Sequence, residues 1–160
     1  MDIFYLYIDK FDFSAGKKYT KHHRAGRYIL DYAAEKFFDI KNPEIEIVNN
    51  KPRFIHSDIN FSVSHSGNIA AVCFDKNPAG FDIEIMKPRD FMPLAERMNF
   101  KLEENTLKEF YRCWTKYEAE YKLQAEAKTA VSMIFQEKYM LSIVSSSEDK
   151  IELNFYEIKN

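Results

Sequence analysis

The sequence is poor in the residues that build disulfide scaffolds, flexible linkers and membrane spans. Its 160 residues include two cysteines, four glycines and five prolines, and no segment approaches the roughly 20 consecutive apolar residues of a membrane helix. Cys73 and Cys113 are far apart and lie within apolar or aromatic runs, so neither a disulfide framework nor a CxxC metal site is supported. We expect both cysteines to be buried, reduced thiols.

An excess of charge of one sign is also absent. The formal net charge is -2 and the sequence pI is about 6.1, so there is no generally basic surface of the kind that binds nucleic acid. The first residues carry acids at Asp2 and Asp9 and no basic segment followed by an apolar run, which is unlike a secretory signal. The sequence therefore predicts a cytoplasmic protein that binds neither nucleic acid nor a membrane.

The composition that is present is typical of one ordinary globular domain, with 46% hydrophobic and 30% charged residues. Apolar periodicity and turn residues predict helices over 18–38, 94–98 and 103–128, and strands over 3–8, 44–48, 80–85, 138–144 and 151–158. A short strand is expected around Arg53, and a hairpin over 61–74 turns at Ser66, Gly67 and Asn68. We interpret the chain as one α+β domain, 1–160, with two lobes at about 1–75 and 76–160.

Two of the predicted helices have apolar faces. In the first helix the face consists of Tyr28, Ile29, Tyr32, Ala33, Phe37 and Phe38. At about 100° per residue, one side of the long helix carries Leu107, Tyr111, Trp114, Tyr121 and Ala125. Glu118 falls among these apolar residues, where a carboxylate is costly unless it is paired. We therefore expect another part of the chain to supply a partner for Glu118.

A second pair of acids lies on one side of a predicted strand. Side chains alternate along a strand, so Asp82 and Glu84 share a face. Taken alone, this spacing is typical of a half-exposed strand. If Glu118 docks beside that face, however, the three carboxylates repel one another unless a cation holds them, and oxygen ligands with room for water and phosphate suit Mg²⁺. Lys122 would then stabilise charge on a phosphate, although a simple Glu118 to Lys122 surface pair is the alternative.

Basic residues are concentrated at the start of the first helix. They are Lys17, Lys18, Lys21, His22, His23, Arg24 and Arg27. A group of this kind is most often a solvated helix face. The alternative is that these basic side chains bind phosphate groups, which they can do without making the whole protein basic.

Four short motifs together resemble a known enzyme family. They are KPRF at Lys51–Phe54, FSVSHSG at Phe61–Gly67, GFDIE at Gly80–Glu84, and W-T-x-x-E-A-x-x-K at Trp114–Lys122. With the basic helix start, they follow the order found in the 4'-phosphopantetheinyl transferase superfamily, the surfactin-synthetase-activating type in particular. The resemblance covers residues 17–122 and implies a two-lobed, pseudo-dimeric fold in which each lobe is a helix packed on a small antiparallel sheet. A monomer is then expected.

The resemblance implies an activity and a role for each matching residue. The activity is Mg²⁺-dependent transfer of 4'-phosphopantetheine from coenzyme A to a serine of an apo acyl or peptidyl carrier protein, as in a holo-[acyl-carrier-protein] synthase. It serves fatty-acid, polyketide or nonribosomal peptide synthesis and releases adenosine 3',5'-bisphosphate. Asp82, Glu84 and Glu118 would surround Mg²⁺, with Glu118 also assisting serine deprotonation and Lys122 contacting the diphosphate. Coenzyme A would further meet Ser64 and His65 at its phosphates, and Lys51 with the Lys21 to Arg24 group at its 3'-phosphate end.

One position departs from the family pattern. The family usually has lysine immediately before the metal-binding glutamate, whereas this chain has Tyr117 there and a lysine at Lys116. At about 160° around the wheel from Glu118, Lys116 lies on the opposite face and cannot replace that lysine. Tyr117 lies nearer, where it can line the rim of the metal site. Two alternatives stay open: a non-catalytic relative that binds coenzyme A or a carrier protein, and an unrelated interaction protein.

Overall fold

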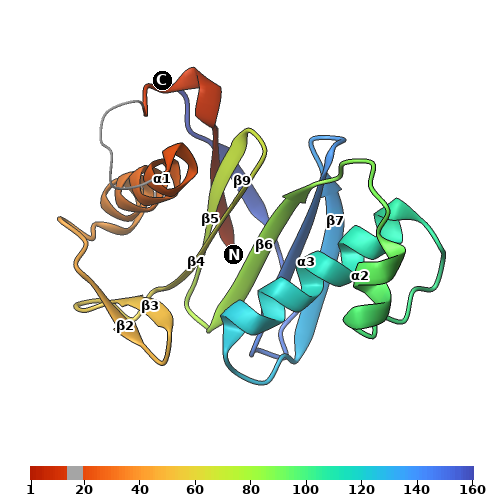
Figure 1. Ribbon diagram of the computed structural model, residues 1–160. Coiled ribbons are helices and arrows are strands. Elements are labelled where there is room, and N and C mark those ends of the chain that lie inside the picture. Colours follow the sequence, from red (N-terminus) through yellow and green to blue (C-terminus); the bar gives the residue numbers. More distant parts are fainter. Residues whose placement is uncertain (14–19) are drawn as a thin grey trace.

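The computed structural model describes residues 1–13 and 20–160, which form a mixed α+β fold (Figure 1). The basic residues Lys17 and Lys18 lie outside the described residues. The helices are α1 (Lys21–Phe38), α2 (Met92–Arg97) and α3 (Leu107–Leu123), with a short 3-10 helix at Ile8–Lys10. The strands are β1 (Asp2–Tyr7), β2 (Ile45–Val48), β3 (Lys51–Phe54), β4 (Asn60–Ser66), β5 (Ile69–Asp75), β6 (Ala79–Ile85), β7 (Thr129–Phe135), β8 (Tyr139–Ser145) and β9 (Asn154–Glu157). The predicted α+β class is confirmed.

The first sheet has the strand order β4-β5-β1-β9. The predicted hairpin is present, because β4 and β5 pair antiparallel and Ser66 lies opposite Ile69. Gly67 has a φ of 55°, the left-handed conformation that a two-residue hairpin turn requires and that glycine adopts without strain. The last strand, β9, pairs parallel with β1. The C-terminal strand thus completes the sheet of the N-terminal half, a pairing that the predicted division near residue 76 did not include.

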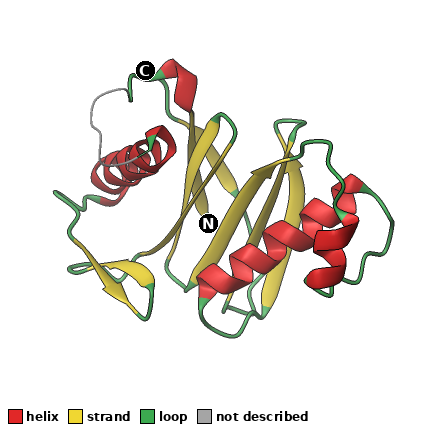
Figure 2. Ribbon diagram, in the orientation of Figure 1, coloured by secondary structure: helices red, strands yellow, loops and turns green. Residues whose placement is uncertain are grey.

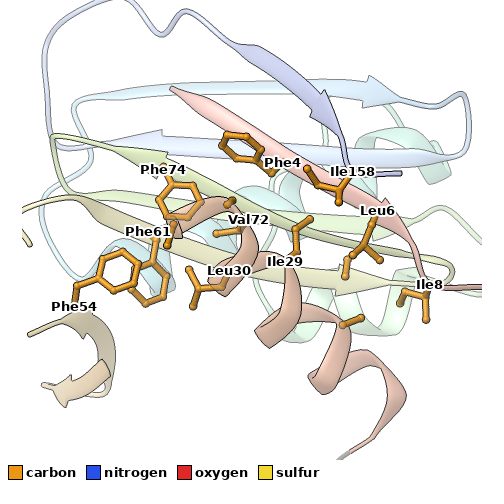
Figure 3. Packing of buried hydrophobic residues seen from close by; sticks show 14 residues of the cluster. Phe4, Leu6, Ile8, Ile29, Leu30, Phe54, Phe61, Val72, Phe74 and Ile158 are labelled. Atoms are coloured by element: carbon orange, nitrogen blue, oxygen red, sulfur yellow. The ribbon is translucent and has the colours of Figure 1, made fainter. Parts of the chain in front are cut away.

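Helix α1 packs on this sheet through its small and aliphatic residues. Ala25, Ile29, Leu30, Ala33 and Ala34 are buried, and Figure 3 shows Ile29 and Leu30 beside the sheet residues of the same core. The predicted apolar face was wrong in part, because its aromatic members Tyr28, Tyr32 and Phe37 are exposed. Small residues let the helix approach the sheet, and Tyr28 and Tyr32 remain at its flank, where they stack 6.0 Å apart. Phe38 is partly buried and stacks on the core residue Phe74 at 4.6 Å.

The second sheet has the order β6-β8-β7, and α3 covers one of its faces. Its other face packs on the first sheet in a core that includes Ile3, Cys73, Phe81, Ile83 and Ile143. The two sheets therefore lie between α1 and α3, and Figure 2 shows these helices on the outside of the fold. Both cysteines are free thiols, of which Cys73 is buried and Cys113 is partly buried.

The long helix is shorter than predicted and is followed by a strand that the sequence did not indicate. Thr106 caps its first turn by accepting a hydrogen bond from the main-chain nitrogen of Glu109, and Gln124 ends it in a left-handed conformation. Strand β7 begins five residues later. It is joined to β8 by Gln136, Glu137 and Lys138. Gln136 and Glu137 have φ values of 48° and 59°, so this short hairpin loop adopts left-handed conformations without the usual Asn or Gly.

The buried face of α3 is rotated from the predicted one. Tyr111 is buried as expected, but Tyr121 is 66% exposed and Ala125 lies beyond the end of the helix. Thr115 and Ala119, which hydrophobicity alone ranks low, are fully buried instead. Among the described residues, no helix is both long and apolar enough to cross a membrane.

Candidate functional site

Glycine at one position lets α3 lie directly against β6. A Cβ atom added to Gly80 would meet the carbonyl oxygen of Ala119 at 1.9 Å and the main-chain nitrogen of Leu123 at 2.7 Å. Real Cβ atoms essentially never approach within 3.0 Å of another heavy atom, so only glycine fits between this strand and this helix. The close contact brings Glu118 and Lys122 of α3 beside the strand that carries Asp82 and Glu84.

These four side chains line a cavity of about 660 Å³. The cavity lies between α1, the β2–β3 hairpin, β4, β6 and α3, and its polar lining also includes Ser64 and His65. The structure therefore brings together six of the predicted site residues. Glu118 faces this cavity from the edge of the buried face of α3, where the charges of Asp82 and Lys122 act on it. Among the described residues, no hydrogen bond or ion pair gives it the partner that its position among apolar residues predicted.

Lys122 is bound to the strand and not to its neighbour on the helix. Its Nζ donates a hydrogen bond to Oδ1 of Asp82 at 2.7 Å and another to the carbonyl oxygen of Phe81 at 3.2 Å. The ion pair is largely shielded, since the side chains of Lys122 and Asp82 are 29% and 5% exposed. The other oxygen of Asp82, Oδ2, is buried without a hydrogen-bond partner among the described residues. An unpartnered buried carboxylate oxygen in a cavity is what a cation would satisfy.

The pKa values of Glu84 and Glu118 are both raised above the usual value of a carboxyl group. Burial raises the pKa of Glu84, a hydrogen bond from Ser66 lowers it, and the charges of Asp82 and Glu118 raise it further. Burial also raises the pKa of Glu118, with a smaller contribution from the charge of Asp82. The three carboxylates are thus close enough to repel one another.

The acids fit an incomplete Mg²⁺ site better than a closed one. In residues 1–13 and 20–160, no three His, Cys, Asp or Glu side chains are placed to hold a metal ion by themselves. Mg²⁺ in phosphate-transfer sites is usually bound by one or two carboxylates, water and the substrate phosphates. The unpartnered oxygen of Asp82 beside Glu84 and Glu118 agrees with that mode of binding, in which the substrate supplies the missing ligands.

The cavity wall formed by α1 and β4 carries histidine and arginine side chains. His23, Arg27 and His65 line it, and burial together with the charges of His22, Lys122 and His23 lowers the pKa of His65. A neutral imidazole can still donate one hydrogen bond to a phosphate oxygen. Lys21 and Arg24 do not line this cavity. Lys21 is exposed, and the guanidinium of Arg24 donates to the carbonyl oxygen of Phe13.

Lys51 is not brought into the cavity. Its side chain is buried, and Nζ donates hydrogen bonds to the carbonyl oxygens of Ala79 at 3.1 Å and Leu123 at 3.3 Å. Burial and the charge of Arg53 lower its pKa. In this position the ammonium ties β3 to the start of β6 and the end of α3. No local pattern around Lys51 indicates such burial, because the two carbonyl groups come from distant parts of the chain.

Tyr117 points away from the acids. Its ring lies 6.0 Å from that of Phe100 and 6.3 Å from that of Trp114, and it borders a separate surface hollow rather than the cavity. The prediction that it could line the rim of the metal site is therefore not met. Lys116 is paired with Glu120 at 3.3 Å on the outer side of α3.

An apolar wall of the cavity was missed in the sequence. Ile45, Ile47 and Pro52 of the β2–β3 hairpin contribute to it, with Val63 and Trp114. Ile47 is 67% exposed. A large aliphatic side chain left open beside charged groups can accept the uncharged part of a ligand. Two isoleucines at alternate positions of a short strand were the available signal.

Curated proteins that resemble this chain are 4'-phosphopantetheinyl transferases. A candidate 4'-phosphopantetheinyl transferase of Haemophilus influenzae is 36% identical over 88 residues, which cover 48% of this chain and 37% of the relative. The 4'-phosphopantetheinyl transferase AcpT of Salmonella typhi is 33% identical over 107 residues, which cover 59% of this chain and 54% of the relative. AcpT of Salmonella typhimurium gives the same values.

These matches cover only part of each protein. The match spans about half the length of the Salmonella relatives and less of the Haemophilus protein. No protein-family model matches the chain. Over about half its length the chain is homologous to 4'-phosphopantetheinyl transferases, which confirms the resemblance that its ordered motifs predicted.

Proposed function

We propose that this protein transfers 4'-phosphopantetheine from coenzyme A to a serine hydroxyl of an apo acyl or peptidyl carrier protein and releases adenosine 3',5'-bisphosphate. The observation that carries the proposal is the cavity in which Asp82, Glu84, Glu118 and Lys122 face His65. Three acids with the ammonium of Lys122 beside them, in a cavity that Arg27 also lines, match a diphosphate that needs both a metal and direct cationic contacts. The homology to 4'-phosphopantetheinyl transferases supports the same reading.

Coenzyme A fits the division of the cavity into charged and apolar walls. Its phosphates would lie between Lys122 and the α1 side, with His65 and Ser64 nearby, and its uncharged parts would lie along Ile45, Ile47 and Pro52. Bound at Asp82, Glu84 and Glu118, Mg²⁺ would neutralise phosphate oxygens. The two-lobed arrangement and a monomeric state belong to the same proposal, with the carrier docking where the lobes meet.

The chemical step is a displacement at the β-phosphorus. The carrier serine oxygen forms a bond to that phosphorus, and the bond to the oxygen bridging the two phosphates breaks. Glu118 is the proposed acceptor of the serine proton, since its burial raises the pKa and makes it a stronger base. Lys122 is already fixed on Asp82 at 2.7 Å, so its ammonium is preorganised to stabilise charge on the leaving bisphosphate.

Mass spectrometry of carrier proteins tests this function directly. The protein is incubated with coenzyme A, Mg²⁺ and a panel of apo carriers, and we expect one or more carriers to gain the mass of phosphopantetheine. Lys122→Ala should abolish most of the transfer. Lys116→Ala is the matched control, because Lys116 lies on the same helix and forms an ion pair with Glu120 outside the cavity.

The non-catalytic alternative predicts a different result. It rested on Tyr117, which lies outside the cavity, so this residue no longer favours it. If the wild-type protein binds coenzyme A and modifies none of the carriers, the non-catalytic reading replaces the proposal.

A further inference from the structure

Three serines on one face of β4 connect the two sheets. Ser62, Ser64 and Ser66 alternate along the strand, so their side chains point the same way, toward β6. Each hydroxyl oxygen accepts a hydrogen bond from a main-chain nitrogen of β6, at 3.1 Å from Phe81, 3.3 Å from Ile83 and 3.1 Å from Ile85. The edge of β6 that does not pair with β8 is therefore satisfied by side chains of β4.

Two of these serines do more than join the strands. The hydroxyl of Ser64 donates to Oδ1 of Asp82 at 2.7 Å, and that of Ser66 donates to Oε2 of Glu84 at 2.5 Å. The third, Ser62, donates only to the main-chain carbonyl oxygen of Phe81, at 3.4 Å. Ser62 thus only joins the two strands, whereas Ser64 and Ser66 join them and also hold an acid.

A serine hydroxyl has a single proton, so the orientation of its O–H bond is fixed once it donates a hydrogen bond to a carboxylate. The hydroxyls of Ser64 and Ser66 each accept a hydrogen bond from a main-chain nitrogen of β6 and donate one to a carboxylate oxygen, which leaves the second oxygen of each acid pointing elsewhere. For Asp82 that second oxygen is the buried atom without a partner in the described part of the chain. Pinning one oxygen of a carboxylate restricts the torsion that would move the other.

We propose that Ser64 and Ser66 are positioning residues that aim the free oxygens of Asp82 and Glu84 at a divalent cation, and this inference rests on the proposed function for the use of that cation. Neither hydroxyl proton is then free to be donated to the substrate. Ser64 is only 6% exposed, and its proton and one lone pair are already engaged. Ser64 thus has a role besides any contact with coenzyme A, because its hydrogen bond to Asp82 is made without the substrate.

The test measures cation binding instead of turnover. Mn²⁺ serves as the probe, its free concentration is followed by electron paramagnetic resonance, and titrations are made with and without coenzyme A. We expect Ser64→Ala and Ser66→Ala each to weaken Mn²⁺ binding by about tenfold or more, the usual effect of removing a group that orients a metal ligand. Ser66→Thr keeps a hydroxyl and should restore most of the affinity.

Ser62→Ala is the matched control. It removes the same kind of junction bond without touching an acid, so it should lower thermal stability like the other variants and leave Mn²⁺ affinity unchanged. If Ser64→Ala does not fold, Ser66→Ala decides the question, because Ser66 is less buried. Equal Mn²⁺ affinity in Ser62→Ala and Ser66→Ala would overturn the inference, as would a wild-type protein that binds no Mn²⁺ under either condition.

The outcome separates this inference from the proposed function. If Mn²⁺ affinity depends on Ser64 and Ser66 while no carrier is modified, the positioning role stands and the transferase proposal fails. If carriers are modified and Mn²⁺ affinity is indifferent to both serines, the transferase proposal stands and the positioning role fails.

Discussion

Replacing Gly80 by alanine tests how the site is held together. The added methyl would lie 1.9 Å from the carbonyl oxygen of Ala119, whereas real contacts of this kind stay beyond 3.0 Å. Helix and strand must then separate by at least about 1 Å. Because the opposing atoms are helix main chain and not the tip of a flexible side chain, we expect a loss near the upper end of the usual overpacking range, about 3 kcal/mol in the free energy of unfolding.

The same displacement would act on the candidate site. Lys122 lies on α3 and Asp82 on β6, and their 2.7 Å contact crosses the interface that must open. A misplacement of about 1 Å in a catalytic group costs roughly 100-fold in rate. We therefore expect Gly80→Ala to lower the transfer rate by about that factor at temperatures where the variant is still folded.

Two measurements check this expectation, namely urea denaturation followed by circular dichroism and carrier modification followed by mass spectrometry. Gly26→Ala is the control for stability. Its Cβ would lie 3.1 Å from the end of the Val63 side chain, which can adjust, and a helical Gly to Ala change gains about 1 kcal/mol. Its stability should stay within about 1 kcal/mol of wild type. A Gly80→Ala protein as stable and active as wild type would refute the close contact of α3 with β6.

Three further changes are expected to act in different ways. Lys51→Met should lower the free energy of unfolding by about 1–3 kcal/mol, since two buried carbonyl groups lose their donor. If the variant is as stable as wild type and binds coenzyme A more weakly relative to the 3'-dephospho form, the predicted phosphate contact of Lys51 is supported instead. Tyr117→Lys should change the transfer rate by no more than about tenfold, measured on any carrier that the wild type modifies; restoration of transfer from zero would contradict this. Glu109→Gln should reduce stability at neutral pH by about 1–2 kcal/mol, because the hydrogen bond from Arg112 lowers the Glu109 pKa to about 2. A lowered carboxyl pKa stabilises the fold above its unfolded value of about 4, so the difference between variant and wild type in urea titrations should shrink as the pH falls toward 2 and not as it rises.

Local patterns in the sequence predicted the parts of the site that depend on a single element. The period of two along residues 80–85 put Asp82 and Glu84 on one face of a strand, and both line the cavity. The Gly67 turn fixed the β4–β5 hairpin and with it the position of His65. Each of these features follows from alternation or turn geometry within about ten residues, which single-sequence patterns report well.

Features that depend on contacts between distant segments were not predictable. The buried face of α3 is set by Gly80, more than 30 residues away, which favours Thr115 and Ala119 over the larger Tyr121. The burial of Lys51 depends on carbonyl groups of β6 and α3. Strand β7 has no regular alternation of polar and apolar residues, and the pairing of β9 with β1 joins the two ends of the chain.

The acids of the site lie at the junction of the two sheets. At this position a substitution can change the geometry of the site without unfolding the protein. One apolar core lies between α1 and the first sheet and another lies between the two sheets, and Asp82 and Glu84 belong to neither. They are held by side-chain hydrogen bonds from β4 and by Lys122 of α3, which are individually worth about 1–3 kcal/mol. A single substitution at the junction can therefore misplace a carboxylate while both cores stay packed, whereas a substitution in the core between the sheets reaches the acids through Phe81 and Ile83, their neighbours on β6.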